Sequence, residues 1–99
     1  MRTFRFEPGY YEWHLIDCAT NETVHNLVDP SEDLYHEDGT PMTKEELADF
    51  FASDIQCANM HYFDNEDYNG ILLDEPLDDA EIAVASKLIA DTLYNYYIA

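Results

Sequence analysis

The stretch TKEELADFFASDIQCAN, residues 43–59, decides the fold because it carries both the start signal and the periodicity of an amphipathic helix. Thr43 and Glu46 match a capping box, in which each side chain can accept a hydrogen bond from the backbone amide of the other residue. Apolar residues then recur at helical spacing and predict a buried face made of Leu47, Phe50, Phe51, Ile55 and Ala58. We therefore predict a helix over 43–59, with Met42 and Leu47 as a hydrophobic staple.

A second helix start lies further along the chain, at Asp78. Glu81 follows three positions later, and Leu77 and Ile82 can form the staple pair. The apolar stripe of this helix consists of Ile82, Ala85, Ile89, Leu93 and Tyr96. Because Val84 and Leu88 lie on a different face, the helix is expected to be central in the core or to contribute to a homodimer as well. We predict this helix over about 78–97.

Strand patterns precede the first helix. Over residues 2–7, aromatic and charged side chains alternate with the period of a half-buried strand, and further strand candidates cover 10–17 and 23–28. Residues 29–41 are rich in turn-forming residue types and show no periodicity, so we interpret them as a surface loop. The apolar residues 71–73 are a possible fourth strand.

These elements predict one α+β domain over residues 1–99, in which an N-terminal antiparallel meander packs against two helices. The apolar content of 46% is enough for one compact core. We expect the sheet to contribute Phe4, Phe6, Tyr11, Trp13 and Leu15. The helices are expected to meet this face with Phe51, Ile55, Ile82, Ile89 and Leu93.

Acidic side chains dominate the composition, with 22 Asp and Glu against 4 Lys and Arg and a net charge of −18. Residues 29–81 hold 17 of these acids and only one of the basic residues. Adaptation to high salt would spread acids over every exposed face, so this concentration favours a binding surface. Nucleic acids and anionic membranes are negatively charged like this chain and would repel it, so we expect the partner to be a basic protein. We expect the chain to act by binding this partner and not by catalysis.

Carboxylates held on a rigid fold can occupy the positions that phosphates take along a duplex. In size, acidity, aromatic content and mixed fold, the chain resembles the DNA-mimic inhibitors of phages and mobile elements, a group that includes anti-restriction and anti-CRISPR proteins. The resemblance lies in composition and not in a shared motif. It implies that the chain blocks the nucleic-acid channel of a nuclease, CRISPR effector, repair enzyme or nucleoid protein. The residues predicted to bind this partner are Glu32, Asp33, Glu37, Asp38, Glu45, Asp49, Asp54, Asp64, Glu66, Asp67, Tyr68, Asp74 and Glu75.

Two other binding functions stay open. Residues 65–76 partly follow the calcium loop of an EF-hand, with Asn65, Asp67 and Asn69 at its first ligand positions and Gly70 at its sharp turn. The twelfth position holds Pro76 where a bidentate Glu is needed, so we predict no metal ligands. An acidic antitoxin-like or chaperone-like partner of a basic protein would share the same electrostatics.

The sequence contains no recognisable catalytic motif, and we predict neither an enzyme nor a cofactor. The four histidines and two cysteines form no nucleophile elbow, phosphate loop, zinc spacing or HExxH pattern. His14 and His61, each beside large aromatic residues, are the strongest of these weak candidates. We expect Cys18 and Cys57 to be reduced and partly buried. Residues 1–17 are interrupted by charges and do not resemble a signal peptide, so a cytoplasmic location is expected.

Overall fold

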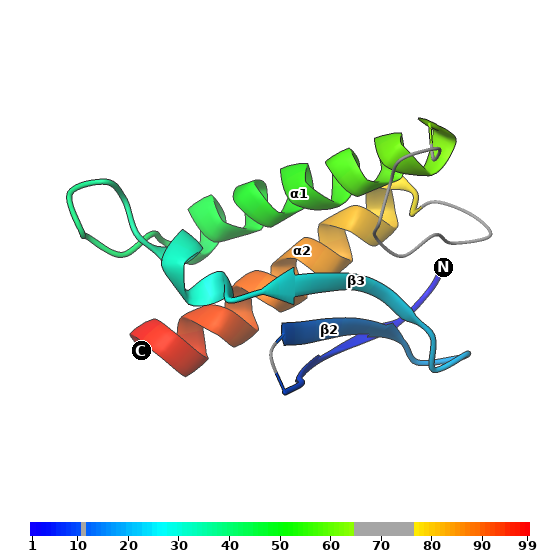
Figure 1. Ribbon diagram of the computed structural model, residues 1–99, viewed down its shortest axis with the longest axis horizontal. Helices are drawn as coiled ribbons and strands as arrows, with labels where there is room; N and C mark the ends of the chain where they lie inside the picture. The colour runs from blue at the N-terminus through cyan, green and yellow to red at the C-terminus, as the bar shows by residue number, and fades with distance from the viewer. Residues whose placement is uncertain (11, 65–76) are drawn as a thin grey trace.

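The computed structural model describes residues 1–10, 12–64 and 77–99, and of residues 58–64 it describes the backbone alone. Three strands come first along the chain, followed by a short helical turn and two long helices (Figure 1). Their bounds are β1 (Phe4–Pro8), β2 (Glu12–Asp17), β3 (Thr23–Val28), the 3₁₀ helix η1 (Pro30–Leu34), α1 (Lys44–Asp64), α2 (Asp79–Leu93) and the π-helical turn η2 (Tyr94–Ile98). The predicted α+β fold is confirmed.

The sheet is an antiparallel meander in the order β1-β2-β3. Its register pairs Phe6 with Leu15 and Trp13 with Leu27, which brings the buried apolar residues of all three strands onto one face. The register shifts between Leu15 and Ile16, which pair with His25 and Thr23, so the extra residue of this irregularity is Val24 in β3. The alternation of the sequence therefore predicts the buried face correctly.

The two long helices run in opposite directions and pack along each other (Figure 1), and α2 also contacts β1. Both capping boxes form: the Glu46 amide donates to Thr43 Oγ1 (3.2 Å) and the Glu81 amide donates to the Asp78 carboxylate (2.8 Å), each with its reciprocal bond. Across the described ranges, none of these helices has the length and apolar character needed to cross a membrane.

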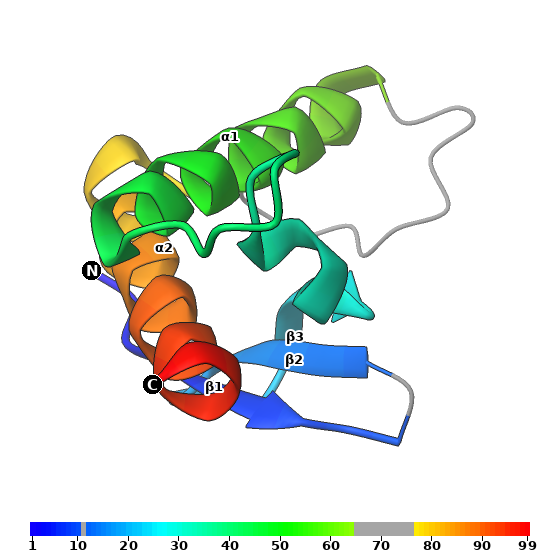
Figure 2. The same ribbon diagram turned by 90° about the vertical axis from the view of Figure 1, so that its left-hand side faces the viewer.

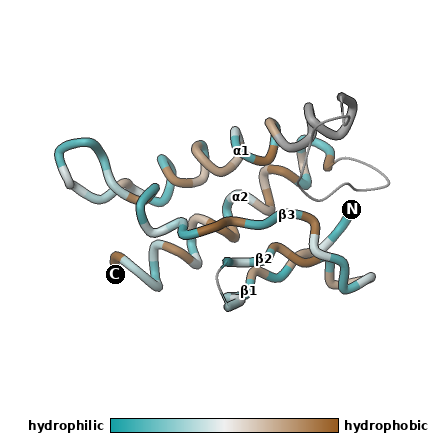
Figure 3. The backbone as a smooth tube through the Cα atoms, in the orientation of Figure 1, coloured by the Kyte–Doolittle hydropathy of each residue, from teal (hydrophilic) through white to brown (hydrophobic). Residues whose placement is uncertain are grey.

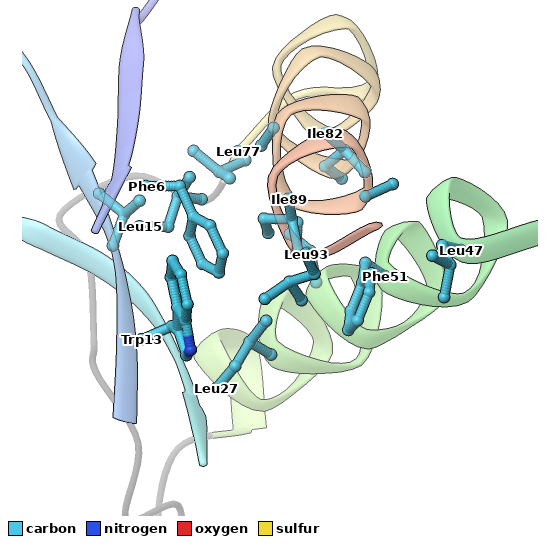
Figure 4. Close-up of a cluster of buried hydrophobic side chains, with 14 of the residues drawn as sticks. Phe6, Trp13, Leu15, Leu27, Leu47, Phe51, Leu77, Ile82, Ile89 and Leu93 are labelled. Atoms are coloured by element: carbon cyan, nitrogen blue, oxygen red, sulfur yellow. The ribbon is translucent and has the colours of Figure 1, made fainter. Parts of the chain in front are cut away.

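The core lies between the sheet and the two helices (Figure 4). Leu15, Leu47, Ile89 and Leu93 are completely buried, and Phe51 is almost so. The tube view shows that apolar positions recur along β2 and α2, whereas the segment before α1 is largely hydrophilic (Figure 3). Most of the core residues expected from the sequence are thus in place.

The interpretation of residues 29–41 as a surface loop is wrong in part, because this segment contains η1 and contributes to the core. Pro30 and Leu34 are buried, and the Met42 amide donates to the Leu34 carbonyl at 2.9 Å. Pro30 stands at the first helical position, where its fixed φ favours a helical turn and no amide is needed. The turn η1, which is too short to show helical periodicity, therefore places Leu34 in the core.

Both helices end differently from the prediction. α1 continues to Asp64, five residues beyond the expected end, while α2 changes at Tyr94 into the π-helical turn η2. Two residues assigned to apolar faces are exposed instead, Phe50 by 41% and Tyr96 by 65%. The possible strand at 71–73 and the side chains of Tyr11 and Ala58 lie outside the described residues.

A buried ionic cluster, which the sequence did not predict, joins the N-terminal segment to α2. The Arg2 guanidinium lies 3.8 Å from Asp17 Oδ2 and 3.5 Å from Glu81 Oε1, and the Arg2 amide donates to Glu81 Oε2 at 2.8 Å. Asp17 and Glu81 are each only 6% exposed. One arginine thus compensates two buried carboxylates, a configuration whose disruption is costly.

Candidate partner-binding surface

The described carboxylates among the predicted partner-binding residues lie on η1, on the turn that follows it and on α1. Glu32 and Asp33 belong to η1 and not to a loop. Exposed positions in the turn and on α1 are held by Glu37, Asp38, Glu45 and Asp49, while Asp54 is half-buried. Asp64 is the last residue of α1, and its side chain is not described. The remaining predicted residues, Glu66, Asp67, Tyr68, Asp74 and Glu75, lie outside the described ranges.

Three of these acids, Glu32, Asp33 and Asp54, form a group that we call the carboxylate cluster. The pKa of Asp33 is raised by partial burial first, and then by the negative charges of Asp54 and Glu32. The cluster joins residues from η1 and from the middle of α1, which are about twenty positions apart in the sequence. The fold therefore holds like charges close enough to repel one another.

His25 on β3 fixes one member of the carboxylate cluster in position. Its Nε2 lies 2.9 Å from Asp54 Oδ2, and its side chain is only 11% exposed. The contact joins the sheet to α1 and orients the Asp54 carboxylate beside η1. Sequence reasoning missed this pair because the two residues are 29 positions apart and no local pattern connects them.

The acidic turn between η1 and α1 is held by its own hydrogen bonds. Asp38 accepts from the Thr40 hydroxyl (2.7 Å) and the Thr40 amide (3.0 Å), and these bonds lower the pKa of Asp38. Gly39 has φ +89°, a left-handed conformation that other residues rarely adopt. At the end of the turn, the Thr43 amide donates to Glu46 and, together with His36 3.1 Å away, lowers the pKa of Glu46.

The lysine and arginine side chains of the chain are engaged elsewhere. Arg2 lies against Asp17 and Glu81, Arg5 against Glu7, Lys44 over the ring of Tyr94, and Lys87 against Asp91. Within the part of the chain that the structure describes, the ion pair that reaches the carboxylate cluster comes from His25. The negative charge of the cluster is therefore largely left to solvent or to a partner.

A separate pocket of about 240 Å³ lies where the β1–β2 turn, the start of η1 and η2 meet. Its lining consists of Pro8, Gly9, Tyr10, Glu12, Trp13, Asp29, Pro30, Tyr96 and Tyr97, and we call it the aromatic pocket. Its tyrosines are exposed, whereas Trp13 is buried beneath them. Sequence reasoning assigned Trp13 and Tyr96 to the core and missed the pocket, since its walls come from three distant segments.

The side chains considered for catalysis or metal binding do not converge in the described residues. No three His, Cys, Asp or Glu side chains there are grouped so that they could hold a metal ion. His14 Nδ1 lies 2.7 Å from the Asn26 side-chain oxygen, and the side chain of His61 is not described. Cys18 and Cys57 are free, and both are exposed, which corrects the expectation that they are partly buried. The EF-hand-like residues 65–76 lie outside the described ranges.

Comparison with known proteins gives no relative from which a function could be transferred to this chain. No protein-family model matches the chain, and neither a curated protein nor a solved structure matches it. Function must therefore be argued from the surface itself.

Proposed function

We propose that this protein binds the basic nucleic-acid-binding surface of another protein and blocks it by taking the place of nucleic acid. The observation that carries the proposal is the carboxylate cluster, in which partial burial, and then the nearby charges of Asp54 and Glu32, raise the pKa of Asp33. A cationic groove would relieve the repulsion between these charges on binding. Charge complementarity of this kind steers association and selects basic partners.

The rigidity of the acidic elements supports the same function. A mimic of a phosphate backbone needs carboxylates in fixed positions, because ordering mobile acids on binding would cost conformational entropy. Here His25 fixes Asp54, one member of the cluster, and hydrogen bonds from Thr40 fix Asp38 in the acidic turn. These two carboxylates are thus oriented before a partner arrives.

A displacement assay tests the proposal. Proteins of a cell extract that bind heparin are mixed with a fluorescent DNA duplex, and the chain is added while the anisotropy of the duplex is followed. We expect release of the duplex at low salt and a steep loss of this effect as salt is added, because exposed charges are screened. Displacement that does not depend on salt would contradict charge mimicry. An antitoxin-like protein for a partner that does not bind DNA would bind without releasing any duplex.

Two matched variants locate the surface. The first, E32Q/D33N/D54N, removes the three charges of the carboxylate cluster, and the second, E7Q/E22Q/D91N, removes three exposed or half-buried acids elsewhere. We expect the first variant to displace DNA at least about tenfold less effectively and the second to stay within about twofold of the unmodified chain. Circular dichroism verifies that both are folded. Equal losses in the two variants would show that only total charge matters.

A further inference from the structure

We propose that the aromatic pocket receives an arginine side chain of the basic partner. The inference rests on the proposed function, because the arginine is assigned to the basic partner proposed there. It adds one specific anchor to a surface that is otherwise defined by charge. The pocket lies apart from the carboxylate cluster but is connected to it through η1, which starts at the pocket wall with Pro30.

The walls of the pocket are tyrosine rings that the fold leaves in solvent. Tyr10 is 89%, Tyr96 65% and Tyr97 38% exposed. Exposed aromatic residues are unremarkable singly, but three around one hollow mark a binding site. The planar guanidinium of arginine stacks on such rings and is attracted by their negative faces.

The rings of Trp13, Tyr96 and Tyr97 are held in place by contacts among themselves. Trp13 stacks on Phe6 with 5.1 Å between the ring centroids, and its indole N–H donates to the Tyr97 hydroxyl at 3.3 Å. Tyr96 meets Trp13 edge-on, with 5.2 Å between centroids and 82° between ring planes. The π-helical turn η2, closed by a bond from the Ala99 amide to the Tyr94 carbonyl, carries both tyrosines. A site ordered in advance loses little entropy when it is occupied.

Two carboxylates complete the site. Glu12 and Asp29 belong to the lining, and the lining includes no lysine or arginine among the residues that the structure describes. Asp29 is exposed and adopts a left-handed conformation with φ 45°, which a residue with a side chain seldom takes up. A guanidinium has five N–H donors for such acceptors, whereas a quaternary ammonium has none and a lysine ammonium is a compact, strongly hydrated charge. This chemistry favours arginine.

The position of η1 connects the pocket with the rest of the acidic surface. Glu32 and Asp33 follow Pro30 within the same five-residue turn. Figure 2 shows η1 lying between the sheet and α1, with the C-terminal turn at the same end of the molecule. A partner whose arginine occupies the pocket therefore brings its neighbouring basic residues toward the carboxylate cluster.

The sole tryptophan of the chain, Trp13, provides the readout. The indole N–H resonance of Trp13 is followed by ¹⁵N NMR while N-acetyl-arginine methylamide is added to the full chain. We expect a saturable shift of this resonance. The lysine analogue and tetramethylammonium, added in parallel, should bind at least about threefold more weakly, because neither offers a planar set of donors. A shift that does not saturate, or tetramethylammonium that binds as tightly as the arginine analogue, would overturn the proposal.

Three variants assign the binding to the pocket. Tyr96→Ala should weaken binding of the arginine analogue about threefold, and Asp29→Asn about fivefold, as expected for an exposed stacking contact and a charged hydrogen bond. Tyr35→Ala is the matched control, since Tyr35 is 41% exposed but does not line the pocket, and it should leave the affinity unchanged. Equal affinities in all three variants would refute the site.

The titration contains no DNA-binding protein, so its outcome is independent of the displacement assay. If the arginine analogue fails to bind while DNA is still displaced, the pocket is refuted and the acidic surface stands. If the analogue binds while DNA is not displaced, the assigned source of the arginine is refuted together with the proposed function.

Discussion

Replacing Arg2 with methionine should destabilise the fold strongly, because it leaves Asp17 and Glu81 buried without their shared cation. Methionine keeps an apolar stem of similar length, and the backbone hydrogen bond from residue 2 to Glu81 can persist. The substitution therefore removes chiefly the ionic contribution of the Arg2 guanidinium to the free energy of unfolding. Removing one partner of a buried ion pair costs about 3–5 kcal/mol.

The expected cost lies at the lower end of that range, about 3 kcal/mol, because both carboxylates keep other donors. Asp17 accepts from the Ala19 amide at 2.8 Å, and Glu81 accepts from the Asp78 amide at 3.1 Å. For a domain of this size, the corresponding fall in Tm is roughly 15 °C. Thermal unfolding followed by circular dichroism measures it, and urea unfolding gives the free energy of unfolding independently.

Arg5 provides a matched control, since it forms an ion pair with Glu7 at the surface, with a separation of 2.6 Å and 39% of the Arg5 side chain exposed. Arg5→Met removes the same charge from an exposed pair and should cost no more than about 1 kcal/mol. Adding Asp17→Asn to Arg2→Met should recover part of the loss, since one of the uncompensated charges is then absent. Equal stability of the two single variants would refute the reasoning from burial.

Three further substitutions test other features. Because the pKa of Asp33 is higher in the folded chain than in the unfolded one, its charge disfavours the fold at neutral pH, and this penalty fades as the pH falls through the folded-state pKa. Asp33→Asn should therefore raise the free energy of unfolding by about 0.5 kcal/mol or less at neutral pH and leave it unchanged in acid, where Asp33 is protonated in both states; the same gain at both pH values would contradict this. Leu34→Ala should cost about 3 kcal/mol in urea unfolding, since Leu34 is fully buried, and a cost typical of a surface site would show that η1 is not part of the core. Gly9→Ala should cost about 1–3 kcal/mol, because its Cβ would lie 2.8 Å from the Glu12 carbonyl oxygen in a turn closed by a 2.6 Å hydrogen bond, and unchanged thermal stability would show that the turn can relax.

The fold was predictable where local patterns decide it. The capping residues Thr43 and Asp78 mark the two helix starts, and the alternation along β2 marks the face that carries Trp13 and Leu15. These signals depend on neighbours within a few residues, and the structure confirms them. The third strand matches its predicted range of 23–28.

The features that the sequence missed depend on contacts between distant segments. Leu34 is buried because α1 and the sheet enclose a single helical turn, which is too short to have a period. Tyr96 has helical spacing but is exposed, since η2 has a wider turn than the preceding helix. The Arg2 cluster and the pair of His25 with Asp54 join residues 79 and 29 positions apart along the chain. The acidic character of the surface could thus be predicted, but the grouping of particular carboxylates could not.

The contacts of the N-terminal segment with α2 and η2 also determine when the chain can fold. Arg2 meets Glu81 across 79 positions, and Trp13 meets Tyr97 across 84. Contacts of such long range slow folding, because a large loop must close before they form. A three-stranded sheet without its covering helices is marginally stable and exposes Phe6 and Trp13 to other chains. During synthesis, the sheet therefore stays prone to aggregation until α2 and η2 have emerged.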